Sequence, residues 1–324
     1  MTLDLQYLMV LQNLREATGG IFDEFFNGLS KVAVDIMPLL PCLVFWCLSR
    51  KWGYRYILTL WGGEVVNGIV KLSVCAYRPW IRSDQINPAG DSKTAATGYS
   101  FPSGHTMCAT GMYGTTAVAE YRKRKWLAVL CIVLILLTGF SRNFLGVHTP
   151  QDVIVGMTET ALVVLGIGLL MKWMGDSQKR IDIMSIVGIA VVIGTILFIK
   201  LKAYPLDYKE DGTLLVDPEK MMPDTFKGCG GLLGLIIGAF IERRWIRYRI
   251  PEGHALLPVL AAVGLGLVYS WNTFFTKPFC VQPLGDQWGK FAAGLAVSIF
   301  TVVIWPLVIR KFCGNGEEKK EEAA

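Results

Sequence analysis

Two stretches of this sequence place basic side chains or a histidine beside residues that begin or end a helix. In KLSVCAYRP, Lys71 and Arg78 stand seven residues apart. This spacing of two helical turns predicts that both project from one face near the end of a helix that Pro79 stops. In GYSFPSGHT, residues 98–106, the order Pro–Ser–Gly predicts a helix start, immediately followed by His105. The free amides and the positive end of the helix dipole make such a start a ready site for an anion.

A third stretch, SRNFLGVHTPQD at residues 141–152, holds three more ionisable side chains between two apolar runs. Arg142 ends the first run, and His148 and Asp152 stand four residues apart where the second run begins. Residues four apart lie on one face of a helix, so a helical conformation here would bring the imidazole to the carboxylate. Charged groups are costly in lipid, so their presence between such runs needs an explanation.

The composition of the chain is that of a membrane protein. Of its 324 residues, 52% are hydrophobic and 18% are charged, against roughly 25% charged in soluble domains. The mean hydropathy is +0.43. These values argue against an ordinary soluble enzyme and require that the three polar stretches be positioned by membrane helices.

Nine apolar runs are long enough to cross a bilayer core, which takes about 20 residues per helix. They are residues 29–49, 54–74, 103–121, 126–141, 152–173, 183–201, 226–242, 255–273 and 288–309. We therefore predict an all-α fold, a polytopic integral membrane helical bundle of about nine transmembrane helices. The three polar stretches fall at ends of the second to fifth of these helices.

The two ends of the chain differ from the middle. Residues 1–28 have apolar side chains at helical spacing among charged ones, which predicts an amphipathic helix lying in the membrane interface rather than a signal peptide. Residues 313–324 form a polar tail with nothing to bury. Between them we expect a core at 29–173, which carries the three stretches, and additional transmembrane helices at 174–312.

The distribution of Lys and Arg predicts the orientation, because short cytoplasmic loops carry an excess of both. Alternate connections and the C-terminal end hold 18 of the 32 basic residues, at 50–55, 121–125, 172–180, 243–249, 310–311 and 319–320. With an odd number of spans, the N-terminus is expected outside and the C-terminus in the cytoplasm. The three polar stretches then share the outer side.

Each polar stretch has a simple interpretation when taken alone. Lys71 and Arg78 could extend to lipid headgroups, the PSGH sequence could be only a helix start, and His148 with Asp152 could be a local surface pair. Together, in this order and on one side of the membrane, they favour a functional site, because ionisable residues at membrane depth usually have a function.

The three segments at 71–79, 102–105 and 141–152 resemble the tripartite signature of the type 2 phosphatidic acid phosphatase superfamily, with no signature position substituted. This superfamily includes lipid phosphate phosphatases, undecaprenyl pyrophosphate phosphatases and glucose-6-phosphatase. The resemblance covers roughly residues 50–172. It is specific for the chemistry and carries little information about the substrate.

The resemblance implies a phosphate-binding site. A phosphate ester carries negative charge that is redistributed in the transition state, so positioning and electrostatic stabilisation dominate catalysis. Lys71, Arg78 and Arg142 would bind the non-bridging oxygens, and the arginines can do so with two hydrogen bonds each. Ser103 and the Gly104 amide would complete the site.

The resemblance also implies a covalent mechanism. His148 would be the nucleophile and form a phosphohistidine that water hydrolyses, while Asp152 accepts the other ring hydrogen. His105 would protonate the leaving alcohol and then activate the water. We expect no cofactor and no metal, because the site lacks a carboxylate cluster and its three cations supply the charge that magnesium would.

Two more polar residues are predicted behind the phosphate-binding residues. Glu64 stands seven residues before Lys71, two turns deeper on the same helical face, and Asn67 lies between them. An acid at that depth is costly unless paired, so we expect Glu64 to face the bundle interior. A structural role explains it better than a catalytic one, and the same holds for Glu159, seven residues after Asp152.

Three hypotheses about function follow. The leading one is a membrane phosphatase that acts on a lipid monophosphate or diphosphate at the outer leaflet. The second is hydrolysis of a soluble ester such as a sugar phosphate, which would use the same catalytic residues. The third is a transporter or scaffold that binds phosphate without turnover.

The expected partners are a membrane lipid phosphate and the bilayer, with no nucleic acid. We expect the plasma membrane of a bacterium as the location, with the active site on the extracytoplasmic side. The eight cysteines contain no CxxC pair and are interpreted as unpaired small hydrophobic residues. The sequence leaves the oligomeric state open.

Overall fold

The long apolar runs fold as helices because a helix satisfies its own backbone hydrogen bonds, which lipid cannot do. The structure, a computed structural model, describes residues 1–90, 92–96 and 98–316. The α-helices are α1 (Leu3–Ala17), α2 (Asp23–Lys31), α3 (Leu40–Leu43), α4 (Arg50–Val74), α5 (Pro79–Arg82), α6 (Ser92–Ala95), α7 (Gly104–Glu120), α8 (Lys125–Phe144), α9 (Pro150–Met174), α10 (Gln178–Leu201), α11 (Met222–Ile241), α12 (Leu257–Ser270), α13 (Gln282–Ile299) and α14 (Trp305–Cys313).

Short π- and 3₁₀-helical segments extend or join these helices. They are η1 (Val32–Ile36), η2 (Met37–Leu39), η3 (Val44–Leu48), η4 (Pro218–Met221), η5 (Glu242–Ile246), η6 (Trp271–Phe275), η7 (Lys277–Val281) and η8 (Phe300–Ile304). Apart from one isolated bridge between Tyr208 and Leu214, the described residues form no β-structure.

Eight helical runs within the described residues are long and apolar enough to cross a membrane, and the chain is an integral membrane protein. The runs are Asp23–Leu48, Arg50–Arg82, Lys125–Phe144, Pro150–Met174, Gln178–Leu201, Pro218–Ile246, Leu257–Phe275 and Lys277–Cys313. The ninth predicted run is α7, which at 17 residues is shorter than the about 20 that span a bilayer core. The predicted all-α membrane bundle is confirmed, and the orientation of its termini stays a prediction.

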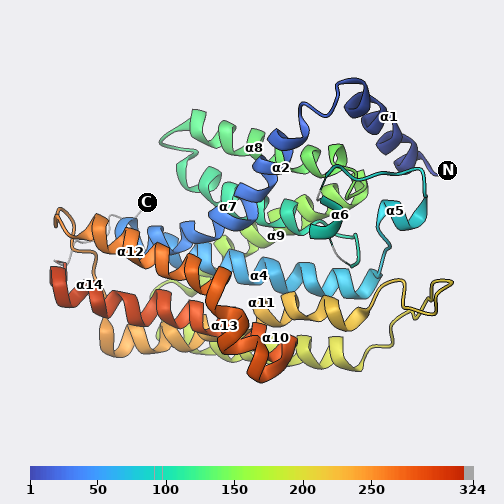
Figure 1. Cartoon of the computed structure of the whole chain (residues 1–324). Helices are drawn as coiled ribbons and strands as arrows, with labels where there is room; N and C mark the ends of the chain where they lie inside the picture. The colour runs from blue at the N-terminus through green and yellow to red at the C-terminus, as the bar shows by residue number, and fades with distance from the viewer. Residues whose placement is uncertain (91, 97, 317–324) are drawn as a thin grey trace.

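Helices α7 and α9 pack on one side of α4, and α10 and α11 pack on its other side, where α13 packs against α11 (Figure 1). On the first side α4, α7 and α9 meet at small residues. A Cβ atom on Gly111 would lie 3.3 Å from Thr59 and 3.6 Å from Thr160, and both threonines are fully buried. Small residues of this kind let membrane helices approach closely.

On the second side, α11 and α13 form the closest helix pair. A Cβ atom on Gly230 would lie 1.9 Å from the carbonyl oxygen of Phe291, and one on Gly234 would lie 2.5 Å from that of Leu295. Neither position tolerates a larger side chain without separating the helices. The glycine-rich run of α11 therefore fixes the distance between these two helices.

The N-terminal segment is more integrated than a helix that only rests on the membrane. In α1, Leu5 and Leu8 pack against Ile86 of the loop after α5, and Asp4 forms an ion pair of 2.7 Å with Arg82. The opposite face exposes apolar side chains such as Val10, which is 65% accessible. Of the predicted polar tail at 313–324, residues 317–324 lie outside the described residues.

Candidate active site

His148 lies in the short connection between α8 and α9, and its side chain is 2% exposed. The chain reverses here because Gly146 adopts φ +73°, a left-handed conformation that glycine reaches without strain. Two backbone amides, those of Val147 and His148, donate to the carbonyl of Arg142 at 3.1 and 3.3 Å. The Asn143 side chain donates to the His148 carbonyl at 2.9 Å. The backbone of His148 is thus held by the last turn of α8.

Asp152 holds the imidazole from the start of α9. Thr149 is the N-cap of α9 and forms a capping box with Asp152. The Asp152 carboxylate accepts hydrogen bonds from the Thr149 amide at 2.8 Å and from the Ser100 hydroxyl. The same oxygen lies 3.3 Å from Nδ1 of His148. The pair therefore arises from a helix cap, since His148 precedes α9 and is not on its helical face.

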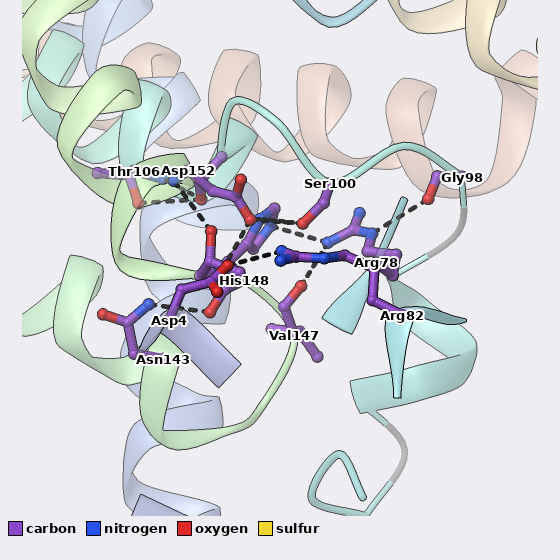
Figure 2. A network of polar contacts seen from close by, with 12 residues as sticks. Asp4, Arg78, Arg82, Gly98, Ser100, Thr106, Asn143, Val147, His148 and Asp152 are labelled. Atoms are coloured by element: carbon purple, nitrogen blue, oxygen red, sulfur yellow. Dashed lines mark hydrogen bonds and ion pairs between the residues drawn. The ribbon is translucent and has the colours of Figure 1, made fainter. Parts of the chain in front are cut away.

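Arg78 determines which ring nitrogen of His148 carries the hydrogen (Figure 2). Its Nη1 lies 2.9 Å from Nε2 of His148. Two backbone carbonyls hold the guanidinium in place: Nη1 donates to that of Val147 at 2.9 Å, and Nε donates to that of Gly98 at 3.2 Å. A guanidinium can only donate, so Nε2 accepts and bears no hydrogen. The hydrogen is then on Nδ1, which donates to Asp152.

Electrostatics keep this imidazole neutral. Burial and the neighbouring Arg78 guanidinium lower the pKa of His148 below its ordinary value of 6.5, and the Asp152 carboxylate opposes this shift only in part. The neutral form leaves the Nε2 lone pair available.

The helical geometry predicted for Lys71 and Arg78 is wrong. The helix that carries Lys71 does not continue to Pro79: α4 ends at Val74 because Cys75 adopts a left-handed conformation with φ 55°. Arg78 lies beyond the helix in an extended conformation, and Pro79 begins α5. The turn after α4, rather than a shared helical face, carries Arg78 to His148.

Most of the predicted site residues line one cavity of about 590 Å³. Those on its wall are Glu64, Asn67, Lys71, Arg78, Gly104, His105, Arg142 and His148. Ser103 and Asp152 are not on the wall, and both are buried behind it. Residues 71–148 thus bring three cations and two histidines to one concave surface.

The start of α7 differs from the predicted phosphate contact in one respect. Ser103 is the N-cap, and its hydroxyl accepts hydrogen bonds from the amide of Thr106 at 3.4 Å and from its hydroxyl at 3.0 Å. Its own amide donates to the carbonyl of Asp152 at 3.0 Å. Gly104 is on the cavity wall, where an added Cβ would meet no atom within 4 Å. The helix terminus and not the serine side chain faces the cavity.

Arg142 reaches the cavity from the last turn of α8. Its Nη1 donates to the Ser30 hydroxyl of α2 at 2.9 Å, and its side chain is almost fully buried. Within the described residues its Nε has no hydrogen-bond partner. The guanidinium therefore has a donor left for an anion in the cavity.

The two acids predicted behind the site lie in different surroundings. The Asn67 amide donates to Glu159 at 2.6 Å, which links α4 to α9. Glu64 is on the cavity wall, near the first turns of α11, where a Cβ on Gly228 would lie 2.9 Å from its Cβ. One carboxylate oxygen of each glutamate has no hydrogen-bond partner in the described part of the chain.

Sequence reasoning missed several residues of this site. Ser100 stands within the second stretch and Asn143 directly follows Arg142, so both could have been included as neighbours of the motifs. Ser30 and Lys227 come from helices far away in the sequence. Only the fold brings them to the cavity.

The fold and this cavity define a class: integral membrane proteins with a buried cavity lined by arginine, lysine and histidine side chains. Within the described residues, no group of three His, Cys, Asp or Glu side chains is placed to hold a metal ion. Residues 52–179 match the sequence model of the PAP2 superfamily. The match covers almost the same residues as the resemblance of the three stretches.

Two curated relatives are similar to the chain. One is a lipid phosphate phosphatase delta of Arabidopsis thaliana, 27% identical over 207 residues, which are 60% of this chain and 48% of that protein. The other is an undecaprenyl-diphosphatase of Sulfolobus acidocaldarius, 28% identical over 120 residues, or 37% of this chain and 55% of that protein. The matched parts thus span about half the length of each relative. No solved structure gives a significant match.

Proposed function

We propose that this protein is a membrane phosphatase that hydrolyses a phosphate ester or diphosphate of a lipid through a phosphohistidine on His148. The observation that carries the proposal is the state of this imidazole. Nε2 accepts from Arg78 at 2.9 Å, Nδ1 faces Asp152 at 3.3 Å, and the ring lies on the wall of a cavity with Lys71 and Arg142. This arrangement gives Nε2 a lone pair on the cavity wall, which Arg78 occupies without substrate and would release when its guanidinium binds a phosphate oxygen.

The first step forms the covalent intermediate. A bound phosphate accepts hydrogen bonds from Arg78, Arg142 and the α7 terminus, so Arg78 exchanges Nε2 for a phosphate oxygen. Nε2 then attacks phosphorus, the bond to the leaving oxygen breaks, and His105, which takes up a proton when the anionic substrate binds, gives this proton to the leaving oxygen. Asp152 stabilises the positive charge that develops on the imidazole.

The second step returns the enzyme to its starting state. His105, now neutral, accepts a proton from a water molecule, whose oxygen attacks phosphorus. The bond between phosphorus and Nε2 breaks, and inorganic phosphate leaves. The three cations stabilise the same charge in both steps, because the phosphoryl group stays in place while the attacking and leaving groups change.

The account assigns no step to a metal ion. The three side-chain cations supply the charge stabilisation that a divalent ion would give. We therefore predict that EDTA leaves phosphate release undiminished, measured in detergent with buffers freed of divalent ions. A strict requirement for added magnesium would contradict this assignment.

A lipid substrate is favoured over a soluble one by the shape of the cavity and by the relatives. The cavity wall continues from the cations to apolar residues on several spans, among them Leu39, Leu60 and Val268. The two relatives carry names that refer to lipid phosphates. A sugar phosphate would use the cationic end alone.

The test is a screen of phosphate release in detergent. It compares undecaprenyl pyrophosphate, phosphatidic acid, phosphatidylglycerol phosphate, a sphingoid phosphate and glucose 6-phosphate. His148→Ala is expected to lower the rate by at least about 10³-fold, and His105→Ala by about 10²–10⁴-fold. His254→Ala is the matched control, because His254 lies outside the cavity wall and should leave the rate unchanged.

The outcomes separate the three hypotheses. Turnover of lipid esters with little action on glucose 6-phosphate supports the proposal, and the reverse preference supports a sugar phosphatase. Wild-type protein that binds phosphate and releases none from any ester would favour a binding protein or transporter. Near wild-type release by His148→Ala would remove the nucleophile assignment.

A further inference from the structure

The C-terminal helices contribute a second, apolar cavity that shares part of its wall with the first one. It has a volume of about 310 Å³, and all of its wall residues are apolar or aromatic. They are Leu267, Val268, Trp271, Phe275, Ala296, Val297, Phe300 and Ile304. Two of them, Val268 and Val297, also line the cavity that contains His148. The two spaces therefore adjoin at these valines.

Packing of large and small residues explains why this space exists. Gly264 of α12 lets that helix rest on two tryptophans, since a Cβ there would lie 2.4 Å from the ring of Trp305 and 2.8 Å from that of Trp46. The glycines of α11 hold α13 against α11 instead. Beyond Gly264, α12 continues into the π-helical segment η6. The C-terminal parts of α12 and α13, together with η6 and η8, thus enclose a groove rather than pack together.

The two ends of the combined space have opposite chemistry. One end presents Lys71, Arg78 and Arg142 with His148, which attract a phosphate group. The other end offers only apolar surface. This surface lies between the runs Leu257–Phe275 and Lys277–Cys313, which are both apolar enough to span a membrane. A single ligand that satisfies both ends has a phosphorylated head and a hydrocarbon chain.

We propose that the groove between α12–η6 and α13–η8 holds the hydrocarbon chain of a lipid phosphate whose head lies at His148. This inference rests on the proposed function, which places the phosphate at His148. It gives the helices from residue 257 onward a role in selecting substrates by chain length. Val268 and Val297 form the passage between head and chain. A chain in the groove fixes the phosphate relative to Nε2, so that long-chain esters react faster than short-chain ones with the same headgroup.

The first experiment narrows the groove. Ala296 lines the second cavity and not the first. The quantity to measure is the preference for chain length, which is kcat/KM for a long-chain ester divided by kcat/KM for its short-chain analogue. We expect Ala296→Trp to lower this ratio by at least about tenfold. Val263→Trp places the same side chain on an exposed face of α12 and should leave this ratio unchanged. An unchanged ratio in Ala296→Trp, with the protein folded, would overturn the proposal.

The second experiment measures binding without turnover. A long-chain lipid phosphate with a photoreactive group at the end of its chain is irradiated with the His148→Ala protein. We expect adducts on residues 257–304, lost with Ala296→Trp and with an analogue that lacks the phosphate. Adducts elsewhere would contradict the groove. Phosphate release by the wild type without adducts here would overturn the groove alone, and adducts without any release would overturn the proposed function alone.

Discussion

At the scale of single residues, the account depends on the protonation of His148. A histidine beside an aspartate usually gains a proton more readily, but here a guanidinium 2.9 Å from Nε2 acts in the opposite direction. The result is a neutral ring whose hydrogen is on Nδ1. This state is the one that a nucleophilic histidine needs before substrate binds.

The pKa of His148 can be measured directly, because the chain has only three histidines. Burial and Arg78 lower this pKa below 6.5, so we predict that the His148 imidazole stays neutral, with its hydrogen on Nδ1, between about pH 5 and 8. Nuclear magnetic resonance of protein with labelled histidines tests this, with His105→Gln and His254→Gln used for assignment. A midpoint at or above 6.5 would disagree with the geometry.

The same shift has a consequence for stability. Because the folded protein has the lower pKa, the unfolded chain binds the extra proton as the pH falls below 6.5. The contribution of His148 to the free energy of unfolding is therefore present above this pH and is lost as the pH falls toward the lower, folded-state pKa.

At the scale of elements, α1 secures the loops around the site. Arg15 is buried and donates to the carbonyl of Phe144, at the end of α8, at 3.3 Å, and to the carbonyl of Asn87. The Gln12 side chain accepts from the Asn87 amide at 2.8 Å. These contacts connect the N-terminal helix to the connection that carries His148.

Removing this connection should weaken the site from a distance. We predict that Arg15→Ala lowers the free energy of unfolding by about 1–3 kcal/mol, because one buried and one partly buried carbonyl lose a charged donor. Thermal unfolding in detergent measures the effect, together with kcat. Arg122→Ala, at an exposed position, is the matched control. Equal Tm values for the two variants would show that these contacts of α1 do not stabilise the fold.

The elements also show what the sequence could and could not predict. Apolar runs and their lengths are local properties, so the spans were predictable. The cap formed by Thr149 and Asp152 at the start of α9 is also local, but the spacing of His148 and Asp152 predicts a helical pair there instead. The path of the chain after α4 was not predictable, since the left-handed conformation of Cys75 has no signal in a non-glycine residue. Contacts such as Ser30 with Arg142 depend on the packing of helices far apart in the sequence.

At the scale of the whole molecule, the described part of the chain combines a segment that matches the PAP2 model, residues 52–179, with one earlier and four later membrane runs. The first part supplies the cations and histidines. Three of the later helices, α11, α12 and α13, line the opposite side of the cavity. The proposed division is therefore between chemistry in the first half and recognition of the chain of the lipid in the second.

The orientation of the molecule is a separate prediction from the distribution of Lys and Arg. We expect a C-terminal epitope tag to be protected from protease in sealed right-side-out vesicles, and an N-terminal tag to be cleaved. Permeabilised vesicles, in which both tags should be cleaved, are the control. Cleavage of the C-terminal tag in sealed vesicles would place the active site on the cytoplasmic side instead.

The central claim is that His148 carries the phosphoryl group, and trapping the intermediate tests it most directly. Wild-type protein is mixed with the preferred ester, labelled with radioactive phosphorus, and quenched in alkali, in which phosphohistidine is stable. The account predicts label on the peptide that contains His148, retained in His254→Ala and absent in His148→Ala. Turnover of the ester with no label on this histidine, or with label on another residue, would contradict it.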